Sequence, residues 1–389
     1  MMADIMGQTG AILSVNIRGL ADRKGLVAAT LLCVALVVAT LLGLDALSQG
    51  LRKTLAQSGD PNIALIMRGG SQAEINSSVS REQLDILLNA PGIGAASPEV
   101  NLIVDGFRRD DNVRANISLR GLTEPGIAMR DAVRLTEGRW PSVGSPELLI
   151  GVNIARTYRN MDVGGAIEFG EVSWKIVGQF ETDGSVAESE IWADLAAVQN
   201  LFERGNTVQS VRIRVDGPQA LSALMAYSEN DPRLQLAVKS EAEYYAAQAA
   251  RTGELVQYLA WPLALLMAVG AIVGAVNTML ASVASRTTEI ATLRVIGFRR
   301  RAIFSGLIIE CALICSVAGL IGAAIAYALL DGLTASTLAG GTTRIGYALQ
   351  FSPSSVMQGI ALAVLIGVFG AMIPATISSF RRVTANLTH

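Results

Sequence analysis

Four long apolar runs constrain the fold of this chain more than any other feature of its sequence. A membrane-spanning helix needs about 20 mostly apolar residues, and residues 26–44, 258–283, 303–330 and 356–377 meet that requirement. The composition agrees, because 51% of the 389 residues are hydrophobic and 16% are charged, whereas soluble domains carry roughly 25% charged residues. The sequence therefore predicts an α-helical membrane protein with four transmembrane helices.

The first apolar run has two possible interpretations. Arg23 and Lys24 precede it, as basic residues precede the apolar part of a secretory signal peptide. The run is longer than the usual 7–15 residues, roughly, of such a peptide, and Ala46-Leu47-Ser48 is a poor cleavage site. We therefore interpret residues 26–44 as a membrane anchor.

Basic residues are distributed unevenly around the four runs. They cluster in residues 1–25, 284–302 and 378–389, whereas the loop of residues 331–355 carries one arginine, Arg344. Loops rich in lysine and arginine stay in the cytoplasm. The sequence thus predicts that both termini and the segment after the second helix are cytoplasmic, and that residues 45–257 and 331–355 are outside.

Residues 45–257 are long enough to bury a core of their own. Short apolar strands alternate with helical stretches, which predicts a mixed α+β domain inserted between the first two helices. Ser80-Arg81-Glu82-Gln83 is a capping-box pattern at the start of a helix, and Val211–Val215 alternates like a half-buried strand. The expected strands are Ile63–Met67, Leu102–Phe107, Ile117–Leu119, Leu148–Ile150, Ala166–Phe169, Lys175–Phe180 and Val211–Val215.

Two stalk helices are expected where this domain joins the membrane. Residues 241–257 contain no proline and one glycine, and they lead directly into the second apolar run. Ser48 to Gln57 follows the first run in the same way. Such stalks could carry motion between the membrane and the domain.

The residues typical of catalysis and of metal binding are scarce. The only histidine is His389, which excludes Ser-His-Asp and Cys-His catalysis and histidine-ligated zinc. The cysteines, Cys33, Cys311 and Cys315, lie in apolar runs without a CxxC spacing. No phosphate-binding glycine motif and no basic-aromatic patch for nucleic acid is present. We expect a non-catalytic chain that binds no cofactor, no metal and no nucleic acid.

Carboxylates in the inserted domain are interpreted as a solvated acidic surface. Asp110-Asp111, Glu188 and Glu190 fall between the expected strands. They lack the regular spacing of oxygen ligands that a calcium loop requires.

The segment from Ala284 to Ile303 reads ASRTTEIATLRVIGFRRRAI and carries five arginines against one acid, Glu289. We expect a cytoplasmic helix over Ser285–Arg301 that Gly297 breaks or ends. The arginines could serve as a topology signal, or Arg299–Arg301 could bind lipid headgroups. Neither interpretation requires Glu289 or Gly297, and a docking element for a cytoplasmic motor would use both.

Ser285 to Ile314 resembles the signature of the FtsX/MacB-type permeases, which are membrane subunits of ABC transporters. Asn277 and Met279, upstream of this segment, also fit the pattern. Glu137–Tyr158 with Trp174–Phe180 resembles the periplasmic core domain of the same family. The signature residues are Arg286, Glu289, Ile290, Leu293, Arg294, Gly297 and Glu310.

This resemblance implies a mechanotransmission (type VII) permease of the bacterial inner membrane, with an FtsX-like domain over residues 263–382 and a periplasmic domain. Such permeases pair with a second permease, identical or not, and work with a cytoplasmic ATPase that binds ATP and magnesium. MacB carries this ATPase on the same chain, whereas about 25 residues precede the first apolar run here, so we expect the ATPase to be a separate polypeptide. A periplasmic adaptor and an outer-membrane channel could join them. The implied function is ATP-driven export of an amphiphilic compound, a peptide or a lipid.

The resemblance also implies roles for particular residues. Arg286, Glu289, Ile290, Leu293, Arg294 and Gly297 would couple the permease to the ATPase. Two polar residues of the expected membrane helices, Asn277 and Glu310, are candidates for coupling within the membrane, Glu310 also for a structural pair. Gly270, Gly274 and Gly319 are candidates for close helix packing.

Two alternative functions remain open at this point. A protein of the FtsX kind relays the motion of an ATPase to a periplasmic hydrolase and transports nothing. A membrane-anchored sensor would work without a motor, although it leaves Glu289 and the arginine-rich insert without a purpose.

Overall fold

The computed structural model describes residues 2–19, 23–90, 93–205, 207–339 and 343–380. Arg381 and Arg382, which the sequence places in a cytoplasmic tail, lie outside these ranges. The chain forms two compact units. The membrane unit comprises Met1–Gln49, Glu254–Leu333 and Leu349–His389, and the inserted domain comprises Gly50–Gly253 and Thr334–Ala348.

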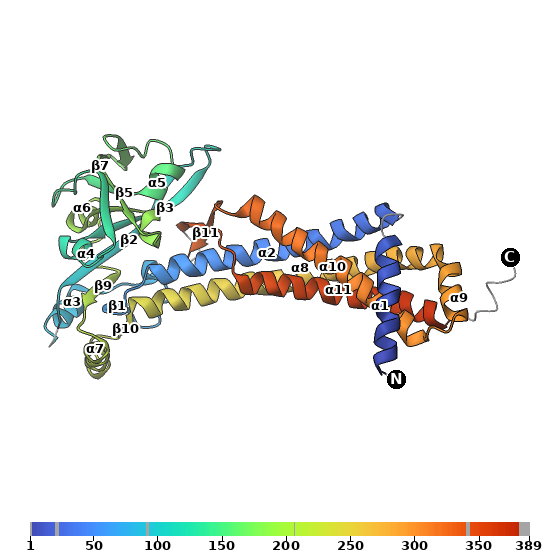
Figure 1. Cartoon of the computed structure of the whole chain (residues 1–389). Coiled ribbons are helices and arrows are strands. Elements are labelled where there is room, and N and C mark those ends of the chain that lie inside the picture. The colour runs from blue at the N-terminus through green and yellow to red at the C-terminus, as the bar shows by residue number, and fades with distance from the viewer. Residues whose placement is uncertain (1, 20–22, 91–92, 206, 340–342, 381–389) are drawn as a thin grey trace. The chain divides into compact units, whose positions relative to one another are not determined.

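Within the described ranges, four helices are long and apolar enough to cross a membrane (Figure 1). The second of them runs for 45 residues without a break, so residues 241–257 are helical, as expected for a stalk. The first likewise continues through the expected stalk segment to Gln57. The four helices are α2 (Lys24–Gln57), α8 (Glu241–Ser285), α10 (Arg300–Leu330) and α11 (Pro353–Phe380).

Small residues bring the membrane helices into backbone contact. A Cβ atom added to Gly322 of α10 would lie 2.4 Å from the carbonyl oxygen of Ala35 in α2. One added to Gly367 of α11 would lie 2.8 Å from the Cα atom of Ala312 in α10. Real Cβ atoms do not approach that closely, so both helix pairs depend on glycine at these positions.

Two shorter helices complete the membrane unit. Helix α1 (Met2–Arg18), which we did not predict, packs its Ile12 against Gly306 of α10. Helix α9 (Thr287–Val295) is shorter than the predicted helix over Ser285–Arg301. The backbone leaves the helical conformation at Arg286 and turns at Gly297, whose φ of +108° favours glycine.

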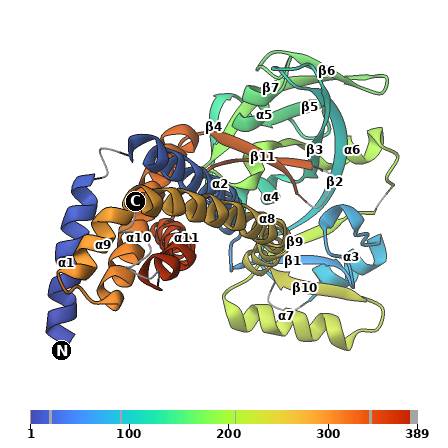
Figure 2. The same ribbon diagram turned by 90° about the vertical axis from the view of Figure 1, so that its right-hand side faces the viewer.

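The inserted domain is built on a ten-stranded, mostly antiparallel sheet with the order β10-β1-β9-β2-β3-β8-β5-β7-β4, and β6 pairs with β7 (Figure 2). The predicted fold class is therefore confirmed: a mixed α/β domain lies between the first and second of four membrane helices. The strands are β1 (Ile63–Arg68), β2 (Ala96–Phe107), β3 (Arg114–Leu122), β4 (Val133–Gly138), β5 (Glu147–Gly151), β6 (Ala166–Phe169), β7 (Val172–Thr182), β8 (Glu190–Asp194), β9 (Ser210–Arg214) and β10 (Leu236–Ser240).

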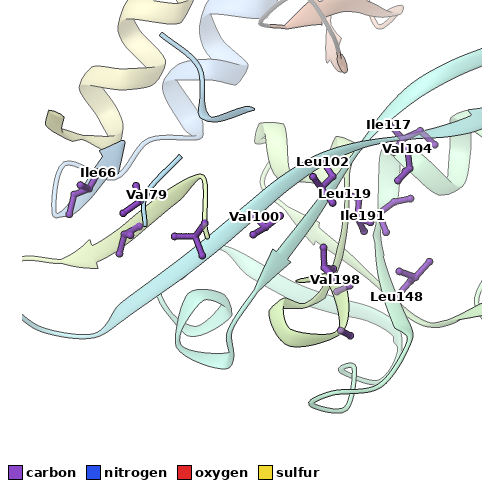
Figure 3. Packing of buried hydrophobic residues seen from close by; sticks show 14 of the residues in the cluster. Ile66, Val79, Val100, Leu102, Val104, Ile117, Leu119, Leu148, Ile191 and Val198 are labelled. Atoms are coloured by element: carbon purple, nitrogen blue, oxygen red, sulfur yellow. The ribbon is translucent and has the colours of Figure 1, made fainter. Parts of the chain in front are cut away.

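Apolar side chains from most of these strands form one core (Figure 3). Leu119 of β3, Leu148 of β5 and Ile191 of β8 are fully buried in it. Short helices cover the sheet, and α3 (Arg81–Leu88) begins with the predicted capping box, in which Ser80 and Gln83 bond to each other's backbone amides. The others are α4 (Glu124–Ala128), α5 (Val152–Thr157), α6 (Leu195–Leu201) and α7 (Pro218–Asn230), with 3₁₀ turns η2 (Glu74–Asn76) and η3 (Val186–Ser189).

Several strands were not predicted. β4, β8 and β10 contain charged residues that broke the apolar pattern we relied on. The loop between α10 and α11 also holds a hairpin of β11 (Thr334–Ala339) and β12 (Thr343–Ala348). The backbone amide of Gly346 in β12 donates to the hydroxyl of Ser189, so the hairpin belongs to the inserted domain.

Candidate functional site

A polar cluster lies where α1, α8, α9 and α10 meet in the membrane unit, and of its members only Glu289 is largely exposed. Its central group is the carboxylate of Glu310, whose side chain is 2% exposed. We call it the Glu310 cluster, and its members are Asn16, Arg23, Ser282, Arg286, Glu289 and Glu310.

The amide of Asn16 joins an arginine and an acid in this cluster. Its Nδ2 atom donates to Oε2 of Glu310 at 2.6 Å, and its Oδ1 atom accepts from Nη2 of Arg286 at 2.7 Å. Two arginines also approach the carboxylate directly, Arg23 at 3.5 Å and Arg286 at 3.8 Å. Arg23 donates in addition to the hydroxyl of Ser282.

The cluster balances two positive against two negative side chains. Arg286 completes it by donating from Nε to Oε2 of Glu289 at 3.0 Å. Removal of one member of a buried, hydrogen-bonded ion pair typically costs about 3–5 kcal/mol, because the remaining charge stays buried without its partner. The Glu310 cluster therefore fixes α1 and the start of α9 against α10.

The predicted coupling residues fall on two sides of α9. Arg286, at the start, is buried in the Glu310 cluster, and Ile290 and Leu293 pack against the core of the membrane unit. Glu289 is 61% exposed, and Gly297 is exposed beyond the helix. The exposed side also carries two apolar residues, Val295 and Ile296, which the resemblance did not single out.

The intramembrane candidates differ in their surroundings. Glu310 is buried and paired, whereas Asn277 is exposed on α8. Gly319 packs within the chain, since a Cβ atom there would lie 3.0 Å from Cβ of Ala363. Gly270 faces open space, and a Cβ atom at Gly274 would lie 4.0 Å from Sγ of Cys33.

A second set of charged residues is buried inside the inserted domain. It joins the 3₁₀ turn η2, strands β2, β3, β8 and β9, the segment after α4 and the first residue of α8. We call it the buried charge network, and its members are Glu74, Glu99, Arg120, Arg130, Glu190, Arg212 and Glu241.

Two arginines hold the carboxylates of this network together. Arg120 donates from Nε and Nη2 to the two carboxylate oxygens of Glu190 at 2.8 and 2.7 Å, and from Nη1 to Glu74 at 2.7 Å. Arg212 donates from Nη2 to Oε1 of Glu74 at 3.0 Å and from Nε to Oε1 of Glu241 at 2.9 Å. Glu241 is the first residue of α8, so the sheet holds the root of that helix through an ion pair.

The electrostatics of the network favour the ionised forms of Glu74 and Glu99. Burial by itself raises the pKa of Glu74, but Arg120 and Arg212 outweigh burial and hold that pKa below its ordinary value. The pKa of Glu99 is lowered in the same way, against burial, by Arg130, Arg212 and Arg120. The charges therefore remain in place at neutral pH.

Two interpretations of the sequence were wrong in this region. Glu188 and Glu190 are buried rather than solvated: Glu188 accepts from the amides of Thr182 and Gly184, and Glu190 binds Arg120. The alternation over Val211–Val215 does not mark a half-buried strand, because Arg212 is 1% exposed. Its side chain points into the charge network and not into solvent. Asp110 and Asp111 are exposed, as predicted.

Two protein-family models match the sequence and identify the family of this chain. A model described as the MacB-like periplasmic core domain matches residues 27–230, just over half of the chain. The chain belongs to the MacB/FtsX-type permeases. A second model, described as the FtsX-like permease C-terminal domain, matches residues 262–381. This permease is thus a multi-pass membrane protein and a permease subunit of an ABC transporter.

Two relatives that match along most of the chain share less than a quarter of the aligned residues with it. The permease is 23% identical over 314 residues to the macrolide export ATP-binding/permease protein MacB of Bordetella avium, covering 75% of this chain and 46% of the relative. It is 24% identical over 369 residues to MacB 2 of Aeromonas hydrophila, covering 89% and 55%. It therefore spans about half the length of these curated relatives. The periplasmic region of MacB from Actinobacillus actinomycetemcomitans is 15% identical, with a TM-score of 0.37, covering 48% of this chain and 91% of that one.

Proposed function

We propose that this permease couples ATP hydrolysis by a cytoplasmic partner ATPase to movement of its inserted domain, and that the movement exports an amphiphilic compound, a peptide or a lipid. The protein would lie in the inner membrane of a bacterium, with both termini cytoplasmic and the inserted domain in the periplasm. ATP and magnesium would bind to the partner, and this chain would contribute no catalytic residue.

The observation that carries this proposal is the two-sided character of α9. Its buried side, with Arg286, Ile290 and Leu293, is attached to the helices of the membrane unit. Its exposed side offers Glu289 together with the apolar Val295 and Ile296. An exposed apolar patch beside a charge is typical of a protein interface. A partner that pulls on the exposed side would therefore move the Glu310 cluster.

Helix α8 provides a covalent route from this point to the inserted domain. It ends at Ser285, next to Arg286, and begins at Glu241, which is bound to Arg212. A continuous helix resists bending and compression better than a loop does, so displacement at one end reaches the other. Transport would then require two arrangements of α8 that nucleotide favours to different degrees.

The proposal is tested by recovery of an ATPase with the tagged permease from native membranes. We expect a P-loop ATPase to co-purify with the wild type and to be lost by at least about tenfold with Glu289→Arg, because reversal of a charge at an interface opposes binding. Val295→Asp, which alters the exposed side without touching the Glu310 cluster, should have the same effect.

Glu171→Arg, on an exposed turn of the inserted domain, is the matched control and should retain the ATPase. If all variants retain the ATPase equally, α9 is not the docking element. If well-folded wild type recovers no ATPase, coupling to a motor is refuted.

A second permease would cover the exposed face of α8. Gly270, Gly274 and Asn277 lie on one side of the helix, and an amide exposed to lipid lacks the hydrogen bonds that a neighbouring chain could supply. Cys33 of α2 is exposed beside Gly274, whereas Cys311 and Cys315 are buried.

This arrangement predicts that mild oxidation of membranes with copper-phenanthroline converts most of the permease into a disulfide-linked dimer through Cys33. Cys33→Ser should abolish the dimer band on a non-reducing gel. A Cys33→Ser variant that carries Leu320→Cys, on the exposed face of α10, is the comparison. A dimer through position 320 and none through Cys33 would assign the interface to α10 instead.

A further inference from the structure

A cavity of about 460 Å³ opens in the inserted domain. It lies between the ends of β3 and β8, helix α4, strand β5 and the loop after β4. Its size is within the range of about 300–1,000 Å³ that is usual for small-molecule sites.

The inner wall of the cavity is apolar and rigid. Leu122, Leu149 and Trp192 form it, and all three are almost fully buried. The Trp192 ring stacks on Phe180 with 4.1 Å between ring centroids, and its Nε1 donates to Glu190 at 2.8 Å. These side chains form a rigid support behind the cavity, and the accessible apolar surface is provided by Ile127, Ala128 and the outer wall. A rigid support lowers the entropic cost of binding, because it needs no ordering when a ligand arrives.

The outer wall is the loop that follows the Gly138-Arg139-Trp140 turn. Trp140 and Val143 line the cavity and remain 40% and 80% exposed. The loop is nevertheless held in place, because Glu147 accepts from the guanidinium of Arg139 and from the amide of Ser142 at 2.9 Å. Two large, exposed apolar side chains on a fixed loop are typical of a surface that binds a ligand or a partner.

The charge of the lining selects among ligands. Its two ionisable residues are both acids, Glu124 in the first turn of α4 and Asp194 at the end of β8. Oδ2 of Asp194 already accepts from the amides of Gly144, Ala196 and Ala197, whereas Glu124 is exposed. The nearby guanidinium of Arg139 is bound to Glu147, so it does not neutralise the cavity.

We propose that this cavity binds a small amphiphilic amine, with its apolar body against Trp140 and Ile127 and its ammonium group at the carboxylate of Glu124. An ammonium group also interacts favourably with a tryptophan ring, and Trp140 is accessible for this contact. The ring of Trp192 is not, because the guanidinium of Arg130 already lies 5.3 Å from its centroid. The inference stands on the inserted domain alone and does not depend on coupling to an ATPase.

The test uses the full-length permease in lipid nanodiscs and three ligands of equal shape: 4-phenylbutylamine, 4-phenylbutan-1-ol and 4-phenylbutanoate. Isothermal titration calorimetry, with empty nanodiscs subtracted, measures each affinity. We expect saturable binding with one site per chain, and the amine to bind about tenfold more tightly than the acid, as one charge-assisted hydrogen bond would give.

Variants separate this site from binding elsewhere. Glu124→Gln should remove most of the preference for the amine and leave the affinity for the alcohol unchanged. Ala128→Trp, on the cavity side of α4, should block all three ligands, and Glu168→Gln on β6 should change nothing. The proposal is overturned by undiminished amine binding in Ala128→Trp, by equal affinities for amine and acid, or by no saturable binding of any of the three.

Discussion

Replacement of Arg212 by methionine is expected to lower the unfolding temperature of the permease by roughly 10 °C. The substitution keeps much of the apolar side-chain volume but leaves Glu74, Glu99 and Glu241 buried with one arginine fewer. A buried charge that loses its partner typically costs about 3–5 kcal/mol, and each kcal/mol lowers the melting temperature by about 2–4 °C in a domain of this size. Tryptophan fluorescence during a thermal ramp in detergent measures the shift.

Strand β9 provides a matched control two residues further along. Arg214 binds Asp131 at 3.1 Å, and both side chains are accessible to solvent. Surface ion pairs contribute about 0–1 kcal/mol, so Arg214→Met should shift the transition by less than about 3 °C. Equal shifts in melting temperature for the two variants would show that loss of a buried charge at Arg212 costs no more than loss of a surface charge at Arg214.

The pH dependence distinguishes lost charge from lost packing. In the wild type the folded-state pKa values of Glu74 and Glu99 lie below their unfolded values, so their contribution is present above about pH 4.3 and is lost as the pH falls through the folded values. Without Arg212, fewer positive charges offset the cost of burying the ionised carboxylates of Glu74 and Glu99. Protonation of these groups then removes part of that cost. The stability difference between wild type and Arg212→Met should therefore shrink between pH 7.5 and pH 4.5. A constant difference would indicate packing alone.

The second large effect is expected from Glu310→Gln in the membrane unit. The substitution removes the buried negative charge that Arg23 and Arg286 approach, so α1 should separate from α10. Ile12 of α1 is buried in the wild type, and a cysteine in its place reports the separation. In a Cys33→Ser background, we expect maleimide labelling of Ile12→Cys to become at least about thirtyfold faster, which corresponds to about 2 kcal/mol.

Two controls accompany this measurement. Ser316→Ala lies on the same helix but removes only a hydroxyl bonded to the carbonyl of Ala312, and it should leave labelling slow. The Glu310→Gln chain without a cysteine at position 12 reports any exposure of Cys311 and Cys315. Unchanged labelling of Ile12→Cys in Glu310→Gln would mean that the apolar contacts of α1 hold it without the cluster.

The elements that could be predicted are those formed by residues close to one another in the sequence. A long, mostly apolar run can be recognised without knowledge of its partners. The capping box of Ser80 and Gln83 can be recognised in the same way, because its two hydrogen bonds join residues three apart. The stalk over residues 241–257 was equally visible as an uninterrupted helical stretch. Glu310 was singled out through the resemblance to the permease signature, and a carboxylate in an apolar run is rare in itself.

Elements that depend on distant partners escaped prediction. Arg212 alternates with valine and isoleucine as a solvent-facing residue would, and only the register of β9 against β1 and β2 brings it beside Glu74 and Glu99. Glu190 begins a strand because its charge is matched by Arg120 on the neighbouring strand. Helix α1 escaped notice because its contact with α10 joins residues almost 300 positions apart.

The strand order of the sheet determines when the inserted domain can fold during synthesis. Strand β1 comes early in the domain, yet its two neighbours are β9 and β10, and the buried charge network closes only with Glu241. Until β9 and β10 have been made, both edges of β1 are unpaired, and Glu74 and Glu99, which Arg120 can already bind, still lack Arg212. Unpaired edges attract other chains, and such distant pairings form slowly. A nascent molecule of this permease is therefore most vulnerable to aggregation just before the second membrane helix emerges, and factors that shield nascent chains would matter most at that moment.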